Sequence, residues 1–183
     1  QFRDYPLIMG IDSLSTPLHQ AVKKLCEGPD GLYYALLFQG GITCFDKDIE
    51  KFLPVRFDKP LELKDILDFC WNDGSLYLVT SQGLFESRIV RKTEGKHDFV
   101  LCLLNPEPVV RGKVAHLCSD GKTNLYFSVN QRKVVHYDLV AKKTSLIKEY
   151  SVVNRLFLRH GYLWICRLWD DIICYDLKTN EER

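Results

Sequence analysis

The sequence of 183 residues lacks a large excess of charge of either sign, because its 25 Lys and Arg residues nearly balance its 24 Asp and Glu residues. A formal net charge of +1 gives no electrostatic reason to expect nucleic acid or an anionic membrane as the main partner. No apolar run approaches the roughly 18 residues of a membrane span. With 46% hydrophobic residues, the composition is that of a folded chain with a single core.

The familiar cysteine and targeting patterns are also missing. None of the seven cysteines pairs with another as C-x-x-C, the spacing typical of zinc knuckles and redox motifs. There is no Asn-x-Ser/Thr sequon and no signal-peptide pattern. We therefore expect reduced thiols in a cytoplasmic or nuclear protein, with a disulfide-bonded protein as the alternative.

Catalytic signatures are absent as well. The sequence contains no H-E-x-x-H, no G-x-S-x-G and no dinucleotide-binding fingerprint. Gly121-Lys-Thr123 resembles the end of a phosphate-binding loop, but His116 stands where the earlier glycine is required. The five histidines have no metal-ligand spacing. We expect no enzyme activity, no cofactor and no metal.

The chain does contain a degenerate repeat of about 40 to 50 residues. Each repeat has a first strand, a turn that ends in glycine, a second strand and a third strand, which β-branched and aromatic residues favour over helices. The first strands are predicted over 22–26, 66–70, 114–118 and 153–157. An aromatic residue in each second strand aligns the repeats at Tyr33, Tyr77, Tyr126 and Trp164.

Looser fourth strands are predicted over 52–57, 99–104 and 145–150, and four strands per repeat are typical of a β-propeller blade. The third strands end in Tyr137-Asp-Leu139 and Tyr175-Asp-Leu177. These endings resemble the WD-repeat class, although the Gly-His that opens a WD repeat is missing. The resemblance implies a divergent, WD-repeat-like β-propeller and matches no specific family.

We predict an all-β, single propeller-like domain over 1–183, with blades at about 21–59, 60–112, 113–151 and 152–183. Residues 1–20 are expected to supply a closing strand, Tyr5–Ile11, and a linker. Two arrangements remain open. The blades form a closed four-bladed ring, or they are part of a larger propeller whose exposed flanks a partner must cover. Another all-β fold is a further alternative.

Four polar residues occupy the same position in the first strands: Lys24, Asp68, His116 and Arg155. Strand alternation predicts that each shares a face with the flanking Val or Ile and with the flanking Cys or Phe. Near the axis of a propeller, the four would form an axial polar ring. We expect it to be an inter-blade hydrogen-bond network, with a binding site for a small anion or an acidic side chain as the alternative.

Several residues are candidate partner contacts. Leu168 and Trp169 lie at a turn tip, where an exposed indole is unfavourable unless a partner or a neighbouring loop covers it. Arg132 and Arg111 lie at turns expected on the same face, and Arg111 belongs to the proline-containing loop 104–112. The basic runs 88–96 and 142–143 are expected at the opposite turns.

The sequence therefore predicts a non-catalytic scaffold that presents loops to another protein chain, as a subunit of a larger complex. That chain could complete or cap the propeller. One alternative is a propeller enzyme or small-ligand binder that uses the axial polar residues. A further alternative is a weak RNA-contacting module, although nucleic acid is not expected as a main partner and no membrane contact is expected.

Overall fold

The computed structural model describes residues 21–38, 41–47, 50–57, 65–92 and 98–183. These ranges contain strands, turns and loops and no α-helix, so the fold is all-β, as predicted. The proposed closing strand, Tyr5–Ile11, lies outside the described residues.

The strands are grouped in four antiparallel meanders, in which each strand pairs with the next along the chain. Meander 1 contains β1 (Val22–Glu27), β2 (Tyr33–Leu37), β3 (Ile42–Asp46) and β4 (Lys51–Phe57). Meander 2 contains β5 (Ile66–Asn72), β6 (Ser75–Thr80), β7 (Gly83–Lys92) and β8 (Asp98–Leu103). Meander 3 contains β10 (Val114–Ser119), β11 (Asn124–Val129), β12 (Lys133–Asp138) and β13 (Lys143–Glu149). Meander 4 contains β14 (Val153–Arg159), β15 (Tyr162–Arg167), β16 (Ile172–Asp176) and β17 (Glu181–Glu182).

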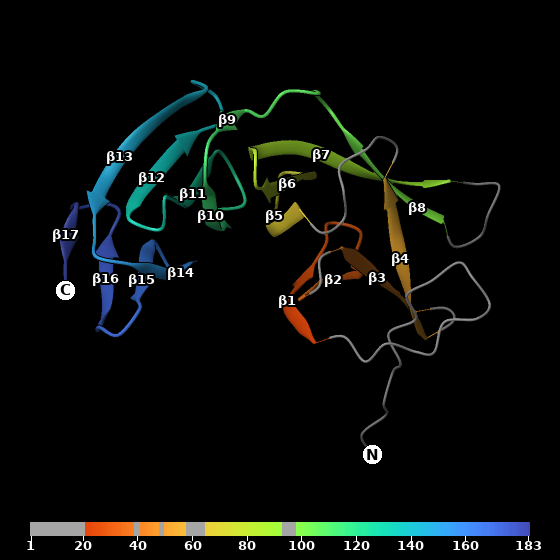
Figure 1. Ribbon diagram of the computed structural model, residues 1–183, viewed down its shortest axis with the longest axis horizontal. Coiled ribbons are helices and arrows are strands. Elements are labelled where there is room, and N and C mark those ends of the chain that lie inside the picture. Colours follow the sequence, from red (N-terminus) through yellow and green to blue (C-terminus); the bar gives the residue numbers. More distant parts are fainter. Residues whose placement is uncertain (1–20, 39–40, 48–49, 58–64, 93–97) are drawn as a thin grey trace, which may run out of the picture.

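The meanders follow one another along an arc, with the first strand of each on the inner side (Figure 1). Meanders 1 and 2 are joined at their outer strands, where β4 pairs with β8 in parallel between Val55 and Phe99. The short strand β9 (Val110–Arg111) pairs with β7, which makes a nine-stranded sheet of this half. The arrangement is propeller-like, but the pairing of β4 with β8 was not predicted.

The strand register corrects one detail of the predicted repeat. Cys26 in β1 lies opposite Tyr34, whereas its equivalent Cys70 lies opposite Tyr77. Tyr34, and not the predicted Tyr33, is therefore the aromatic equivalent of Tyr77. The two adjacent tyrosines of β2 made the sequence alignment ambiguous by one residue.

Consecutive meanders pack face to face, and every interface is built in the same way. We call the face of a meander that contacts the following meander its leading face, and the opposite face its trailing face. At the first interface, leading residues such as Tyr34 and Ile42 pack against trailing residues such as Phe69 and Leu78. Separate cores of the same kind join meander 2 to meander 3 and meander 3 to meander 4.

In each innermost strand, the regular pairing with the second strand is broken either just before the axial polar residue or across it. The register shifts between Ala115 and Cys118 in β10, and His116 has a φ of 55° there. Such a bulge adds one residue and reverses the alternation of faces beyond it. Val114 consequently packs in the same core as Leu117, on the trailing face. The predicted common face for His116 and its flanking Val was therefore wrong.

The last meander has a short fourth strand that the sequence did not predict. β17 pairs with β16 through Glu182 and Tyr175, and Arg183 continues the pairing with Cys174. Glu182 also accepts hydrogen bonds from Lys148 Nζ at 2.8 Å and from the Tyr150 hydroxyl at 2.7 Å. Part of the outer edge of β16 is therefore paired with C-terminal residues. The predicted closing N-terminal strand would need that same edge.

Candidate functional site

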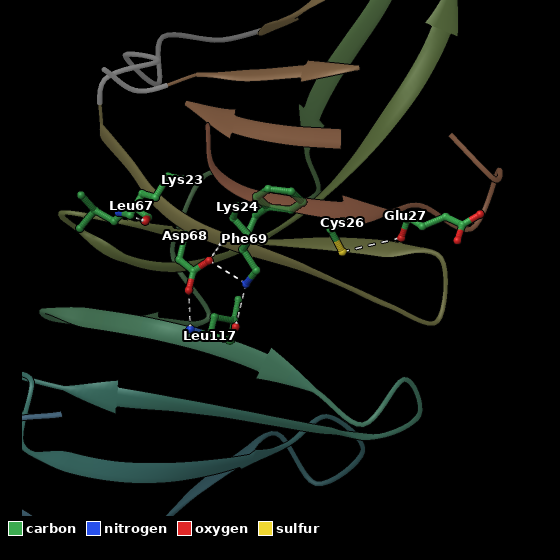
Figure 2. Close-up of polar contacts among 8 residues, drawn as sticks. All are labelled: Lys23, Lys24, Cys26, Glu27, Leu67, Asp68, Phe69 and Leu117. Carbon is green, nitrogen blue, oxygen red and sulfur yellow. Dashed lines mark hydrogen bonds and ion pairs between the residues drawn. The ribbon is translucent and has the colours of Figure 1, made fainter. Parts of the chain in front are cut away.

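The predicted axial polar residues lie on the innermost strands, and two of them form a network between meanders. Lys24 Nζ lies 2.8 Å from Asp68 Oδ1 and donates a second hydrogen bond, of 3.1 Å, to the Leu117 carbonyl. Asp68 Oδ2 accepts a hydrogen bond of 2.8 Å from the Leu117 amide. Figure 2 shows Asp68 between Lys24 of meander 1 and Leu117 of meander 3. These contacts bind three consecutive meanders together.

Both carboxylate oxygens of Asp68 accept hydrogen bonds in this network. Besides Lys24 and Leu117, its Oδ1 accepts a hydrogen bond of 2.8 Å from the amide of Phe69. Lys23 adds a parallel contact, because its Nζ donates to the Leu67 carbonyl at 2.6 Å. A carboxylate held by a cation and two amides is well suited to fix strands in place, and poorly suited to act as a free general base.

His116 does not contact the Lys24–Asp68 pair through a hydrogen bond. Its Nδ1 lies 2.9 Å from the Ser128 hydroxyl of its own meander. Burial lowers the pKa of His116, and the nearby charges of Lys23, Arg155 and Lys24 lower it further, while Asp68 opposes the shift. The imidazole is therefore held in its neutral form near neutral pH.

Arg155, like His116, remains outside the Lys24–Asp68 network. It is exposed, and no hydrogen bond or ion pair joins it to another residue in the described part of the chain. It lines an open axial cavity of about 920 Å³, together with Lys23, Lys24 and His116. The structure thus brings all four predicted residues to one cavity but joins only Lys24 and Asp68 directly.

The cysteines of the innermost strands are poor nucleophiles in this fold. Burial raises the pKa of the Cys70 thiol and raises that of Cys118 to about 12. A thiol with so high a pKa carries almost no reactive thiolate near neutral pH. No disulfide is present within the described ranges, and those ranges contain no group of three His, Cys, Asp or Glu side chains that could hold a metal ion.

The turn between β15 and β16 presents the most exposed aromatic side chain described. Trp169 is 95% exposed and has a φ of 63°. Arg167 fixes the turn through ion pairs with Asp171 and, at 2.7 Å, with Asp170. The Leu168 amide donates to the Val152 carbonyl at 2.9 Å, which anchors the turn beside the entry to β14. The indole therefore projects into solvent from a well-braced turn.

The other predicted contacts are engaged within the chain. Arg132 Nε donates to the Ser151 carbonyl at 3.1 Å, and Arg111 forms an ion pair with Glu107 inside the loop 104–112. Gly83 allows the backbone of this loop to approach closely, because a Cβ at position 83 would lie 2.1 Å from the Val110 carbonyl oxygen. Whether these residues bind a partner stays a prediction, and part of the basic run 88–96 lies outside the described residues.

Sequence reasoning missed a second surface, the leading face of meander 4. Phe157, Ile172 and Trp164 line an apolar surface pocket on it. The strand register makes Ile172 equivalent to Ile42, because each lies opposite a second-strand residue two positions after the repeat aromatic. The repeat alignment shows only that this position is apolar in every meander, as Ile42, Leu84, Val134 and Ile172. It carries no signal that Ile172 is the exposed one.

Comparisons with known proteins show the fold and no family. No protein-family profile and no curated protein matches the sequence. Among solved structures, the extracellular domain of a protein assigned as a one-component system of B. thetaiotaomicron superposes with a TM-score of 0.71 at 12% identity. That match covers 96% of this chain but 25% of the other.

Two further structures are similar. An auxiliary nutrient-binding protein of Bacteroides thetaiotaomicron matches with a TM-score of 0.61 at 17% identity, over 89% of this chain and 40% of its own. A chain of the mitotic checkpoint complex matches with a TM-score of 0.59 at 15% identity, over 91% and 51%. This chain therefore spans at most about half the length of these structures.

Within the described ranges, no helix has the length and hydropathy to cross a membrane.

Proposed function

We propose that this protein is a non-catalytic binding module that presents the turn Leu168–Trp169–Asp170 to another protein chain. One observation carries the proposal: the 95% exposed Trp169 projects from a turn held by Arg167. Exposing an indole to water is unfavourable, and tryptophan is enriched among residues that dominate binding energy. A turn that is already ordered loses little conformational entropy when it binds.

The axial geometry supports a structural role for Lys24 and Asp68, which favours a binding module over an enzyme. Asp68 accepts hydrogen bonds from Lys24 and from two backbone amides, and the buried thiols near it have raised pKa values. The small-ligand alternative retains one supporting feature, the cations Lys23 and Arg155 beside the axial cavity. A cytoplasmic or nuclear location is part of the same proposal.

The test is a quantitative affinity purification of the full chain and two variants from the cells that produce it. Trp169→Ala should reduce recovery of the bound protein at least tenfold, the scale of one interface hot spot. Val140→Ala is the matched control, because Val140 is 78% exposed at the turn that follows β12. Equal recovery with both variants and unchanged melting temperatures would refute the role of Trp169.

A further inference from the structure

The axial cavity is large enough for a small molecule. Its volume is about 920 Å³, and all four innermost strands contribute to its wall. Lys23 comes from β1, Leu67 from β5, Ala115 from β10 and Arg155 from β14. Pockets that bind small molecules have volumes of about 300–1,000 Å³. The cavity therefore has room for a ligand larger than a single ion.

The charged side chains that line this cavity do not cancel one another. They are Lys23, Lys24, Asp68 and Arg155. Lys24 and Asp68 form an ion pair at 2.8 Å, so these two charges compensate each other. Lys23 donates to the neutral Leu67 carbonyl, and within the described ranges no carboxylate pairs with Lys23 or Arg155. Two positive charges therefore face the cavity without a compensating negative charge.

The imidazole of His116 lies within the combined field of these cations. Burial is the largest cause of its lowered pKa, and Asp68 opposes the shift. The charges of Lys23, Arg155 and Lys24 all lower that pKa further. Because these cations act on one side chain of the cavity wall, their fields overlap there. An anion in the same space would be attracted by all of them.

A phosphate group suits the two uncompensated cations better than a carboxylate does. A phosphate monoester carries a charge of about −1.5 to −2 near neutral pH on one group with three acceptor oxygens, whereas a carboxylate carries a single negative charge. The guanidinium of Arg155 is exposed and makes no hydrogen bond with a described residue. Arginine binds phosphate through its planar fork of N–H donors, and lysine binds it as a point charge.

The rest of the wall is uncharged and suits the remainder of such a ligand. Gln131 and Asn154 contribute side-chain amides, and Leu25 and Phe38 contribute exposed apolar side chains. Small-molecule sites typically combine apolar side chains with a few polar groups that fix the orientation of the ligand. The cavity has both kinds of group beside its two cations.

We propose that the axial cavity binds a small ligand through a phosphate group, which Lys23 and Arg155 hold together. This inference goes beyond the proposed function, because it uses the axial cavity and not the turn that carries Trp169. Lys24 and Asp68 keep their structural role, since their ion pair joins meanders 1 and 2.

Isothermal titration calorimetry of the full chain with inorganic phosphate tests the proposal, at an ionic strength held constant with chloride. One phosphate should bind per chain. Acetate, which represents an acidic side chain, should bind at least tenfold more weakly because it carries one charge. Arg155→Gln and Lys23→Gln should each weaken phosphate binding at least tenfold, the scale of one charged hydrogen bond. Both residues are exposed, so neither change should prevent folding.

The matched control is Arg159→Gln. Arg159 is also an exposed arginine of β14, but it does not line the axial cavity. This variant should bind phosphate as the unmodified chain does. Nuclear magnetic resonance locates the site, because the ring signals of His116 should shift on phosphate addition while those of the exposed His160 stay in place.

Four results would overturn the proposal. Phosphate does not bind with saturation, or Arg155→Gln leaves its affinity unchanged. Equal weakening by Arg159→Gln would show a diffuse attraction to positive charge and no site. An acetate affinity equal to that of phosphate would show that the cavity accepts a carboxylate, such as the acidic side chain of a protein, and does not select phosphate. A shift at His160 in place of His116 would put the anion elsewhere on the surface.

Discussion

The first and the last leading face of the arc differ in their surroundings much more than in their residues. Ile42 and Ile172 are equivalent in strand register, and so are Cys44 and Cys174. Yet Ile42 is 1% exposed and Ile172 is 59% exposed. The residue type and the local backbone are the same, so the difference comes from the meander that packs on one face and not on the other. Whether a side chain on a leading face is buried therefore depends on whether another meander packs against that face.

The largest expected effect is on the two isoleucines. Ile42→Ala should lower the free energy of unfolding by about 3 kcal/mol, because it removes buried methyl groups and leaves a cavity. Ile172→Ala should change it by less than about 0.5 kcal/mol, since that side chain is largely in water. Urea denaturation of both variants measures the two values. Similar losses at the two positions would mean that the face of meander 4 is covered in the isolated chain.

The axial residues Asp68 and Arg155 give a second comparison, between a side chain with hydrogen bonds to other meanders and one without. Asp68→Ala should cost about 2 kcal/mol, because it leaves the Lys24 ammonium and the Leu117 amide without their partner. Arg155→Ala should lie within about 0.5 kcal/mol of the unmodified chain, since no described residue loses a hydrogen bond. The same denaturation experiment decides this, and a large loss at Arg155 would show that its charge is already used within the chain.

A smaller effect should appear in the pH dependence. The folded pKa of His116 is lowered, so the unfolded chain binds a proton more readily than the folded chain. Stability should therefore be full above the ordinary histidine pKa of 6.5 and should fall as the pH drops below it. His116→Gln should make this decline shallower when melting temperature is measured between pH 7.5 and 5. The control His160→Gln, on an exposed turn, should leave the decline unchanged.

Most of the strand order could be read from the sequence. Turns that end in glycine and alternating apolar residues mark each meander, and the predicted strands 22–26, 66–70, 114–118 and 153–157 fall within β1, β5, β10 and β14. The pairing of β4 with β8 could not be predicted. It joins residues far apart in the chain, and neither strand carries a local signal that selects its outer neighbour.

The candidate site was only partly predictable. Equivalent positions in the repeat predicted an axial ring of Lys24, Asp68, His116 and Arg155, and these four residues line one cavity in the structure. Which of them pair depends on the bulges in the innermost strands, because a bulge changes the direction of every side chain after it. The exposure of Ile172 could not be predicted from the sequence either. It depends on whether another meander packs on that face, and not on the residue type.

The most direct test of the account uses two cysteines at equivalent positions on the leading faces of meanders 1 and 4. Cys44 is fully buried and burial raises its pKa to about 12, whereas Cys174 is half-buried on the open face. A maleimide pulse followed by mass spectrometry gives the labelling rate of each thiol. In the isolated chain, Cys174 should react on the order of 100-fold faster than Cys44. Equal rates in the isolated chain would contradict an open leading face on meander 4.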